Sequence, residues 1–119
     1  MKKNELAAAM RLAVEVCAID KLDDSEVHVV SKELKAFNLS AEENDEIIEL
    51  FKGISPFRAV EILKDSDANT KKESASLCIV ALNADGECSD KEQGAYFLAK
   101  TICDFPSLSF TEAKEHLNL

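Results

Sequence analysis

The chain has few of the residues that interrupt regular secondary structure. Its 119 residues include only 3 Gly and 2 Pro, a single Tyr and no Trp. So few glycines and prolines predict long regular elements with short connections. The many Ala, Leu, Glu and Lys residues favour helices over strands. No uninterrupted apolar run reaches about 18 residues, so neither a transmembrane helix nor direct membrane insertion is expected.

Basic residues are also scarce. The chain has 23 acidic residues against 14 basic ones, and its formal net charge is −9. Because a surface with this charge repels phosphate groups, we expect no nucleic-acid partner. Cations and basic patches on other proteins are the partners that the charge permits.

The cysteines lack the paired spacing of a redox or zinc motif. Most of them lie inside apolar patterns, which predicts reduced core thiols in a cytoplasmic protein. Charged residues interrupt the apolar stretch near the N-terminus, so no signal peptide is expected. The four positions are Cys17, Cys78, Cys88 and Cys103.

Apolar periodicity predicts seven helices and no strand, and therefore an all-α single domain over residues 1–119. The first helix is expected at about 5–19, with Asn4 as its N-cap. Pro56 is suited to the first turn of the fourth predicted helix. A central apolar helix is expected at about 70–84. However, the polar stretch 64–76, considered by itself, is most simply interpreted as a loop. Capping boxes predict the starts of four helices after Asp23, Ser40, Ser89 and Ser109.

The same periodicity assigns apolar residues to the core. The inward residues are predicted to be Leu6, Met10, Ala13, Val14 and Cys17 in the first helix, Ile47, Ile48 and Phe51 in the third, Phe57, Val60 and Leu63 in the fourth, Ala95, Leu98, Ala99 and Ile102 in the sixth, and Phe110, Ala113 and Leu117 in the seventh.

Two segments of the chain resemble each other weakly. Each has an apolar helix, an Asp, a short loop and a capping box that starts the next helix. Aligned on Asp20 and Asp85, the two segments lie 65 residues apart in the sequence. This pattern predicts that the domain consists of two weakly related halves.

The second of these segments, ALNADGECSDKE at 81–92, partly matches an EF-hand calcium loop. With Gly86 at loop position six, Asp85 and Glu92 fall on ligand positions. However, Ala81 occupies position one, where a carboxylate is normally required. The EF-hand is therefore the weaker interpretation of the segment.

Helix ends explain most of the same residues. Gly86 is expected to end the fifth helix in a left-handed conformation, and Ser89 with Glu92 to form a capping box. Asp85 and Glu87 are left without a structural role, which is why they are candidates for a functional one.

The segment also resembles the A-x-A-D-G-E-[IVL]-[ST]-x-x-E signature of the tellurite-resistance TerB-like family. Cys88 stands where that signature has an aliphatic residue, and residues 18–26 correspond to its degenerate first copy. The resemblance implies an all-helical fold in two halves and a non-enzymatic stress-response or scaffold role. The matching residues are Ala84, Asp85, Gly86, Glu87, Cys88, Ser89 and Glu92.

The resemblance further implies a divalent cation held by loop carboxylates. Oxygen ligands alone would suit Ca²⁺, Mg²⁺ or Mn²⁺. The alternative is that the acidic residues are only solvated helix ends. The candidate metal ligands are Asp85, Glu87 and Glu92, with Asp20, Asp23 and Glu26 opposite them if the two halves face each other.

No Ser-His-Asp, Cys-His, Walker or Rossmann arrangement is found, and His28 and His116 are interpreted as surface histidines. We therefore expect a non-enzymatic module that binds a protein partner, with the cation as an added component. Two alternatives stay open: a metal-free interaction protein and a homodimeric scaffold.

Overall fold

A computed structural model describes the chain except for residues 18–36, 38 and 84–88. The described residues form six helices and no strand, packed into one globule, which confirms the all-α prediction. None of these helices is both long and apolar enough to cross a membrane. The helices are α1 (Lys3–Cys17), α3 (Ala41–Gly53), α4 (Pro56–Lys64), α5 (Ala68–Leu82), α6 (Asp90–Cys103) and α7 (Phe110–His116).

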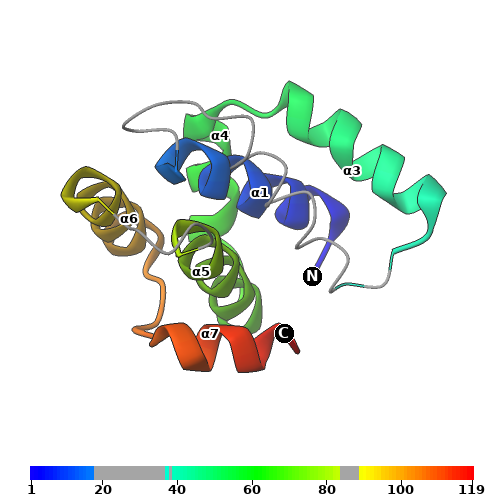
Figure 1. The fold of residues 1–119 in the computed structure, drawn as a ribbon. Helices are drawn as coiled ribbons and strands as arrows, with labels where there is room; N and C mark the ends of the chain where they lie inside the picture. Colours follow the sequence, from blue (N-terminus) through cyan, green and yellow to red (C-terminus); the bar gives the residue numbers. More distant parts are fainter. Residues whose placement is uncertain (18–36, 38, 84–88) are drawn as a thin grey trace.

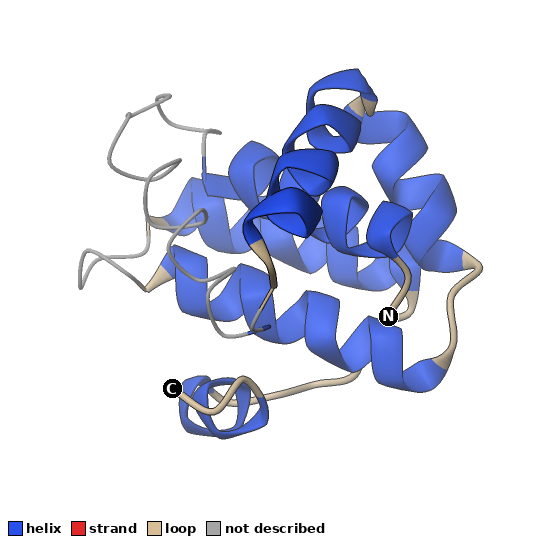
Figure 2. Ribbon diagram, turned by 90° about the vertical axis from the view of Figure 1, so that its right-hand side faces the viewer, coloured by secondary structure: helices blue, strands red, loops and turns tan. Residues whose placement is uncertain are grey.

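Two helices share the centre of the globule. Helix α1 packs against α3, α4, α5 and α6, whereas α5 packs against α1, α4, α6 and α7. Figure 1 shows α3 along one side of α1, and α7 lies at the bottom in both that view and Figure 2. The predicted central helix is therefore correct, but it shares the core with α1. The predicted second helix lies outside the described residues.

Burial on α1 extends beyond the predicted stripe. The five residues of the stripe are buried as expected, but Ala7, Ala8 and Ala9 are also fully buried, at 0% exposure. This occurs because α1 has neighbours on several sides. The helix begins at Lys3, so Asn4 is not its N-cap as predicted. Instead, Glu5 Oε1 accepts a hydrogen bond of 2.9 Å from the Lys2 backbone N–H.

Arg11 fastens the end of α3 to α1. Its guanidinium donates to the backbone carbonyls of Ile54 at 3.0 Å and Phe51 at 2.9 Å. The same group lies 4.1 Å from the centre of the Phe51 ring. The Phe51 carbonyl also accepts from the Ile54 N–H at 3.3 Å, so Arg11 adds a second donor there and supplies a donor to the Ile54 carbonyl.

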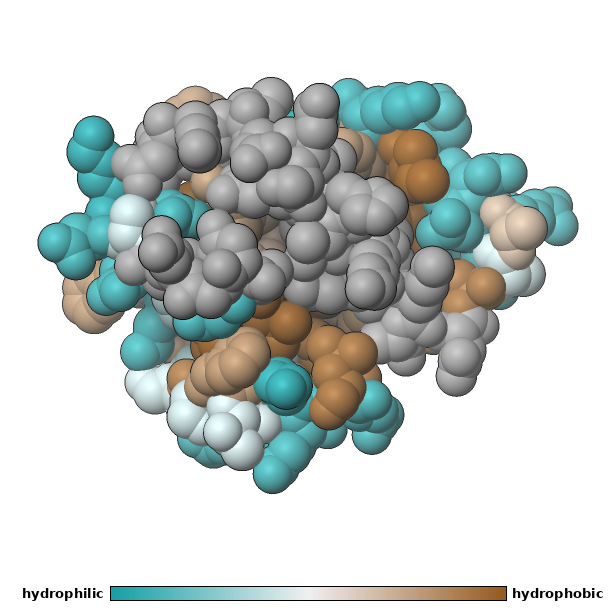
Figure 3. All heavy atoms as spheres, in the orientation of Figure 1, coloured by the Kyte–Doolittle hydropathy of each residue, from teal (hydrophilic) through white to brown (hydrophobic). Residues whose placement is uncertain are grey.

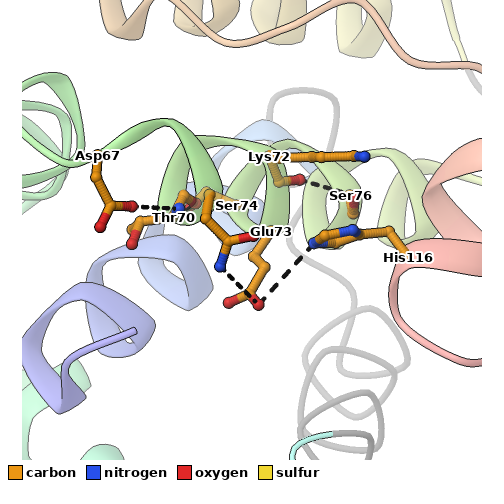
Figure 4. A network of polar contacts seen from close by, with 8 residues as sticks. Asp67, Thr70, Lys72, Glu73, Ser74, Ser76 and His116 are labelled. Atoms are coloured by element: carbon orange, nitrogen blue, oxygen red, sulfur yellow. Dashed lines mark hydrogen bonds and ion pairs between the residues drawn. The ribbon is translucent and has the colours of Figure 1, made fainter.

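Helix α5 begins earlier than the loop interpretation of residues 64–76 allowed, so that interpretation is wrong from Ala68 onward. Asp67 caps the helix by accepting a hydrogen bond of 2.8 Å from the Thr70 N–H. The buried Ser74 and Ser76 donate to the carbonyls of Thr70 and Lys72, each at 2.8 Å (Figure 4). Hydroxyls bonded to their own helix can be buried without an unpaired polar group, which is why this polar sequence forms a buried helix.

A histidine of α7 lies close to a glutamate of α5. His116 Nε2 lies 3.9 Å from Glu73 Oε1 (Figure 4). Asn69 donates to that same oxygen at 3.4 Å. The His116 side chain is only 19% exposed, so it is partly buried and not the surface residue that was predicted. His28 lies outside the described residues.

Two aromatic residues predicted to face the core point toward solvent. Phe57 is 89% exposed because Ala59 and Leu63 form the inward side of α4. Phe110 is 41% exposed, with the Lys114 ammonium 5.3 Å from its ring centre.

On the face in Figure 3, described apolar residues gather in the lower part of the view, over α5 and α7.

The alanine run of α1 gives a stability prediction. Ala8→Leu adds three carbon atoms at a position with no exposed surface, so we expect the free energy of unfolding to fall by about 1–3 kcal/mol. Urea denaturation followed by circular dichroism measures the change. Ala68→Leu, at the exposed first residue of α5, is the matched control and should be nearly neutral. Equal effects of the two substitutions would contradict the close packing of α1.

Candidate functional site

Five of the six predicted metal ligands lie outside the described residues: Asp20, Asp23, Glu26, Asp85 and Glu87. Whether they come together therefore stays a prediction, as does the similarity of the two halves. Within the described part of the chain, no group of three or more His, Cys, Asp or Glu side chains is arranged to hold a metal ion. The sixth candidate, Glu92, is described at the start of α6.

The end of α5 bears on the EF-hand interpretation. Ala81 is buried within the last turn of α5. Asn83 is the C-cap, and its side-chain amide donates to the Ile79 carbonyl at 2.7 Å. The helix thus ends at Leu82, four residues before Gly86, which corrects the prediction that Gly86 ends it. Loop position one consequently belongs to a packed helix and has no ligand group.

Glu92 has the structural role predicted for it. Its N–H donates to Ser89 Oγ at 3.1 Å, and its Oε1 accepts from the Ser89 N–H at 3.3 Å. The residue is only 8% exposed, so this capping box is largely shielded from water. A bidentate metal ligand uses both carboxylate oxygens, and coordination of that kind would compete with the cap.

The orientation of α6 differs from the one predicted. Its buried residues are Glu92, Ala99 and Cys103, whereas Leu98 is 62% and Ile102 46% exposed. Phe97, on the same helix, is 67% exposed. The sequence signal for this orientation is the small pair Ala99 and Cys103, four residues apart, which lets α6 approach its neighbours closely.

A hollow of about 330 Å³ lies between α5 and α6. Its side chains are apolar, amide, phenol and ammonium groups, and the Lys100 ammonium is already bonded to Ser107 Oγ at 2.7 Å. The described residues of the lining include no carboxylate and no imidazole, so they offer no acid–base pair of the usual kind. The lining residues are Ile79, Leu82, Asn83, Gln93, Tyr96, Phe97 and Lys100.

Tyr96 carries its hydroxyl into the interior. Within the described residues the hydroxyl is buried and has no hydrogen-bond partner. Burial raises the pKa of the Tyr96 phenol, and the nearby thiols of Cys78 and Cys103 raise this pKa further. No motif points to this residue, although the only tyrosine of an aromatic-poor chain is easily identified.

The described cysteines are core residues. Cys17, Cys78 and Cys103 are buried, and Cys103 Sγ lies 3.9 Å from the Val60 carbonyl oxygen. Burial raises the pKa of the Cys103 thiol, which lowers the fraction of reactive thiolate. These positions agree with the predicted core thiols, and Cys88 lies outside the described residues.

The buried phenol predicts an unusual alkaline titration. Above a pH of about 10, the unfolded chain releases the Tyr96 proton whereas the folded chain retains it. The contribution of Tyr96 to the free energy of unfolding should therefore decrease as the pH rises past that value. Because Tyr96 is the only tyrosine and the chain has no tryptophan, phenolate absorbance reports on this residue alone.

We expect phenolate absorbance to develop only together with unfolding, as followed by circular dichroism. Tyr96→Phe should weaken the loss of stability above a pH of about 10. At neutral pH it should be neutral or stabilising by about 1 kcal/mol, because it removes a buried hydroxyl for which the described residues provide no partner. A phenol that ionised at its ordinary pKa in the folded protein would contradict its burial.

Comparison with known proteins gives a fold and no activity. No family model matches the chain, and no curated protein matches it. The structure is similar to the crystal structure of a protein of unknown function from Porphyromonas gingivalis W83. The TM-score is 0.83 at 25% sequence identity, and the match covers 100% of this chain and 91% of the other. The all-helical arrangement is therefore shared with a solved protein.

Proposed function

We propose that the chain is a TerB-like, non-enzymatic interaction module of a cytoplasmic stress response, and that it binds a protein partner through α6. One observation carries this proposal: α6 exposes Phe97, Leu98 and Ile102 to solvent. Large apolar side chains that cluster on a surface mark a site of protein interaction more often than scattered ones do.

The position of α6 links this surface to the TerB-like signature. The signature residues Ser89 and Glu92 form the capping box that starts the helix. Phe97 lies less than two turns beyond Glu92 on the same rigid element. A change at Ser89 or Glu92 would therefore alter the start of the helix that carries the exposed residues, which supports a common role for the two.

A divalent cation is the second component of the proposal. Ca²⁺, Mg²⁺ or Mn²⁺ would be held by carboxylates of the two loops, and its support is the match to the signature together with the acidic character of the chain. Glu92 is the one candidate metal ligand that the structure describes, and its carboxylate lies at the start of α6. The metal-free alternative assigns the same carboxylates to partner choice alone.

The interaction component predicts a loss of partner capture. Phe97→Ser with Leu98→Ser should reduce the amount of partner recovered from a lysate by about tenfold or more, because apolar anchors dominate interface energies. Quantitative mass spectrometry of the captured proteins measures the amount of partner recovered. The control is Leu50→Ser with Phe110→Ser, on α3 and α7, where the side chains are 40% and 41% exposed. Unchanged recovery with both double variants would contradict the proposal.

The cation component has a direct test. Ca²⁺, Mg²⁺ or Mn²⁺ added at up to about 1 mM should change the NMR spectrum of the wild-type chain near the start of α6. Asp85→Asn with Glu87→Gln should abolish the response. Glu42→Gln with Asp45→Asn removes two carboxylates from exposed positions of α3 and should preserve it. A spectrum that no metal changes would eliminate the cation and leave the metal-free interaction protein.

A further inference from the structure

We infer that the outer face of α6 binds a second copy of this chain, in a two-fold dimer that pairs α6 with α6. The inference rests on the proposed function, because it names the partner for the same surface. We define the α6 face by five exposed residues of this helix: Gly94, Phe97, Leu98, Thr101 and Ile102.

The spacing of these residues is that of a helix-pairing surface. They occupy positions i, i+3, i+4, i+7 and i+8 of one helix, so they form a single stripe along it. The opposite side of α6 already packs on the globule through Ala99 and Cys103. The helix thus has two packing stripes, and only the inner one is covered by the described part of the chain.

The small residues of the stripe provide a second observation. A Cβ at Gly94 would meet no atom within 4 Å, so the fold does not require glycine there. Glycine inside a helix lowers its stability, and close approach of another backbone is a recognised reason for its presence. Thr101 Oγ1 donates to the Phe97 carbonyl at 2.9 Å, so its polar group is satisfied within the helix and its methyl remains for packing.

The charge around the α6 face does not oppose the approach of a copy of the same chain. Helices α4 and α6 together carry four basic and three acidic residues, although the whole protein has a net charge of −9. Helix α3, by contrast, carries five acidic residues and one basic residue. Two copies that meet through α6 therefore avoid the repulsion between their acidic surfaces, which would oppose association elsewhere.

The exposed area suits a small two-fold interface. Phe97 offers roughly 150 Å². With Leu98 and Ile102 the apolar area of the α6 face is roughly 300 Å² per copy, within the range of functional surface patches, and the flanking polar residues would supply the rest of the roughly 800 Å² of a standard interface. In a two-fold pair the same patch of each copy contributes to the interface, so the apolar area counts once for each copy.

Sedimentation equilibrium of the full chain, from about 10 µM to about 1 mM, tests the inference. The wild-type chain should be a dimer at the upper end of this range. Phe97→Ser with Leu98→Ser should raise the dissociation constant by about 100-fold or more, because both residues lie on the α6 face. Leu50→Ser with Phe110→Ser should leave it unchanged.

Gly94→Gln separates dimerisation from folding. The site is open, so the monomer should keep or increase its thermal stability through the better helix propensity of Gln. The same side chain would hold two α6 helices apart, so the dimer should dissociate. A wild-type chain that is monomeric at about 1 mM, or a dimer that survives the α6 substitutions, would overturn the inference.

Failure of this inference and failure of the proposed function give different results. If the wild-type chain is monomeric while recovery of a lysate protein still depends on Phe97 and Leu98, the interaction module stands and the second copy is wrong. If α6 substitutions dissociate a dimer but do not change what is recovered, the homodimer stands and a separate protein partner is excluded.

Discussion

The close packing of α1 is the constraint on which the remaining structure depends. Ala7, Ala8 and Ala9 are fully buried on consecutive positions, so they point to different sides of one helix. Four of the other described helices contact α1, and small side chains allow their axes to approach it. Any enlargement would move more than one neighbour at once, so α1 tolerates larger side chains poorly.

Small side chains also determine which side of α6 faces solvent. This helix approaches the globule through the small residues Ala99 and Cys103, and its larger apolar residues consequently face solvent. Tyr96 fills the space beneath it without finding a hydrogen bond for its hydroxyl in the described part of the chain. The internal fit of α6 thereby determines which side chains are available for association.

Features that depend on a few adjacent residues were predictable from the sequence. The capping boxes at Ser40, Ser89 and Ser109 are present because each involves a cap and the third residue after it. The start of α5 was missed because serine hydroxyls can bond their own helix, which periodicity does not register. For α6, two apolar stripes were available, and only the neighbouring helices decide which one is buried. The loop carboxylates depend on how two distant segments meet, which local patterns do not determine.

The attachment of α3 has a consequence for how the molecule opens. Among the described elements, α3 packs against α1 alone, and Arg11 bonds to the carbonyls at its end. An element with a single packing neighbour can detach without disrupting the contacts among the others. Helix α3 is therefore suited to be an independent unit of local unfolding. Its amide protons would exchange with solvent earlier than those of α1. Added salt would weaken the exposed ion pair between Lys3 of α1 and Glu46 of α3, and would therefore favour this opening.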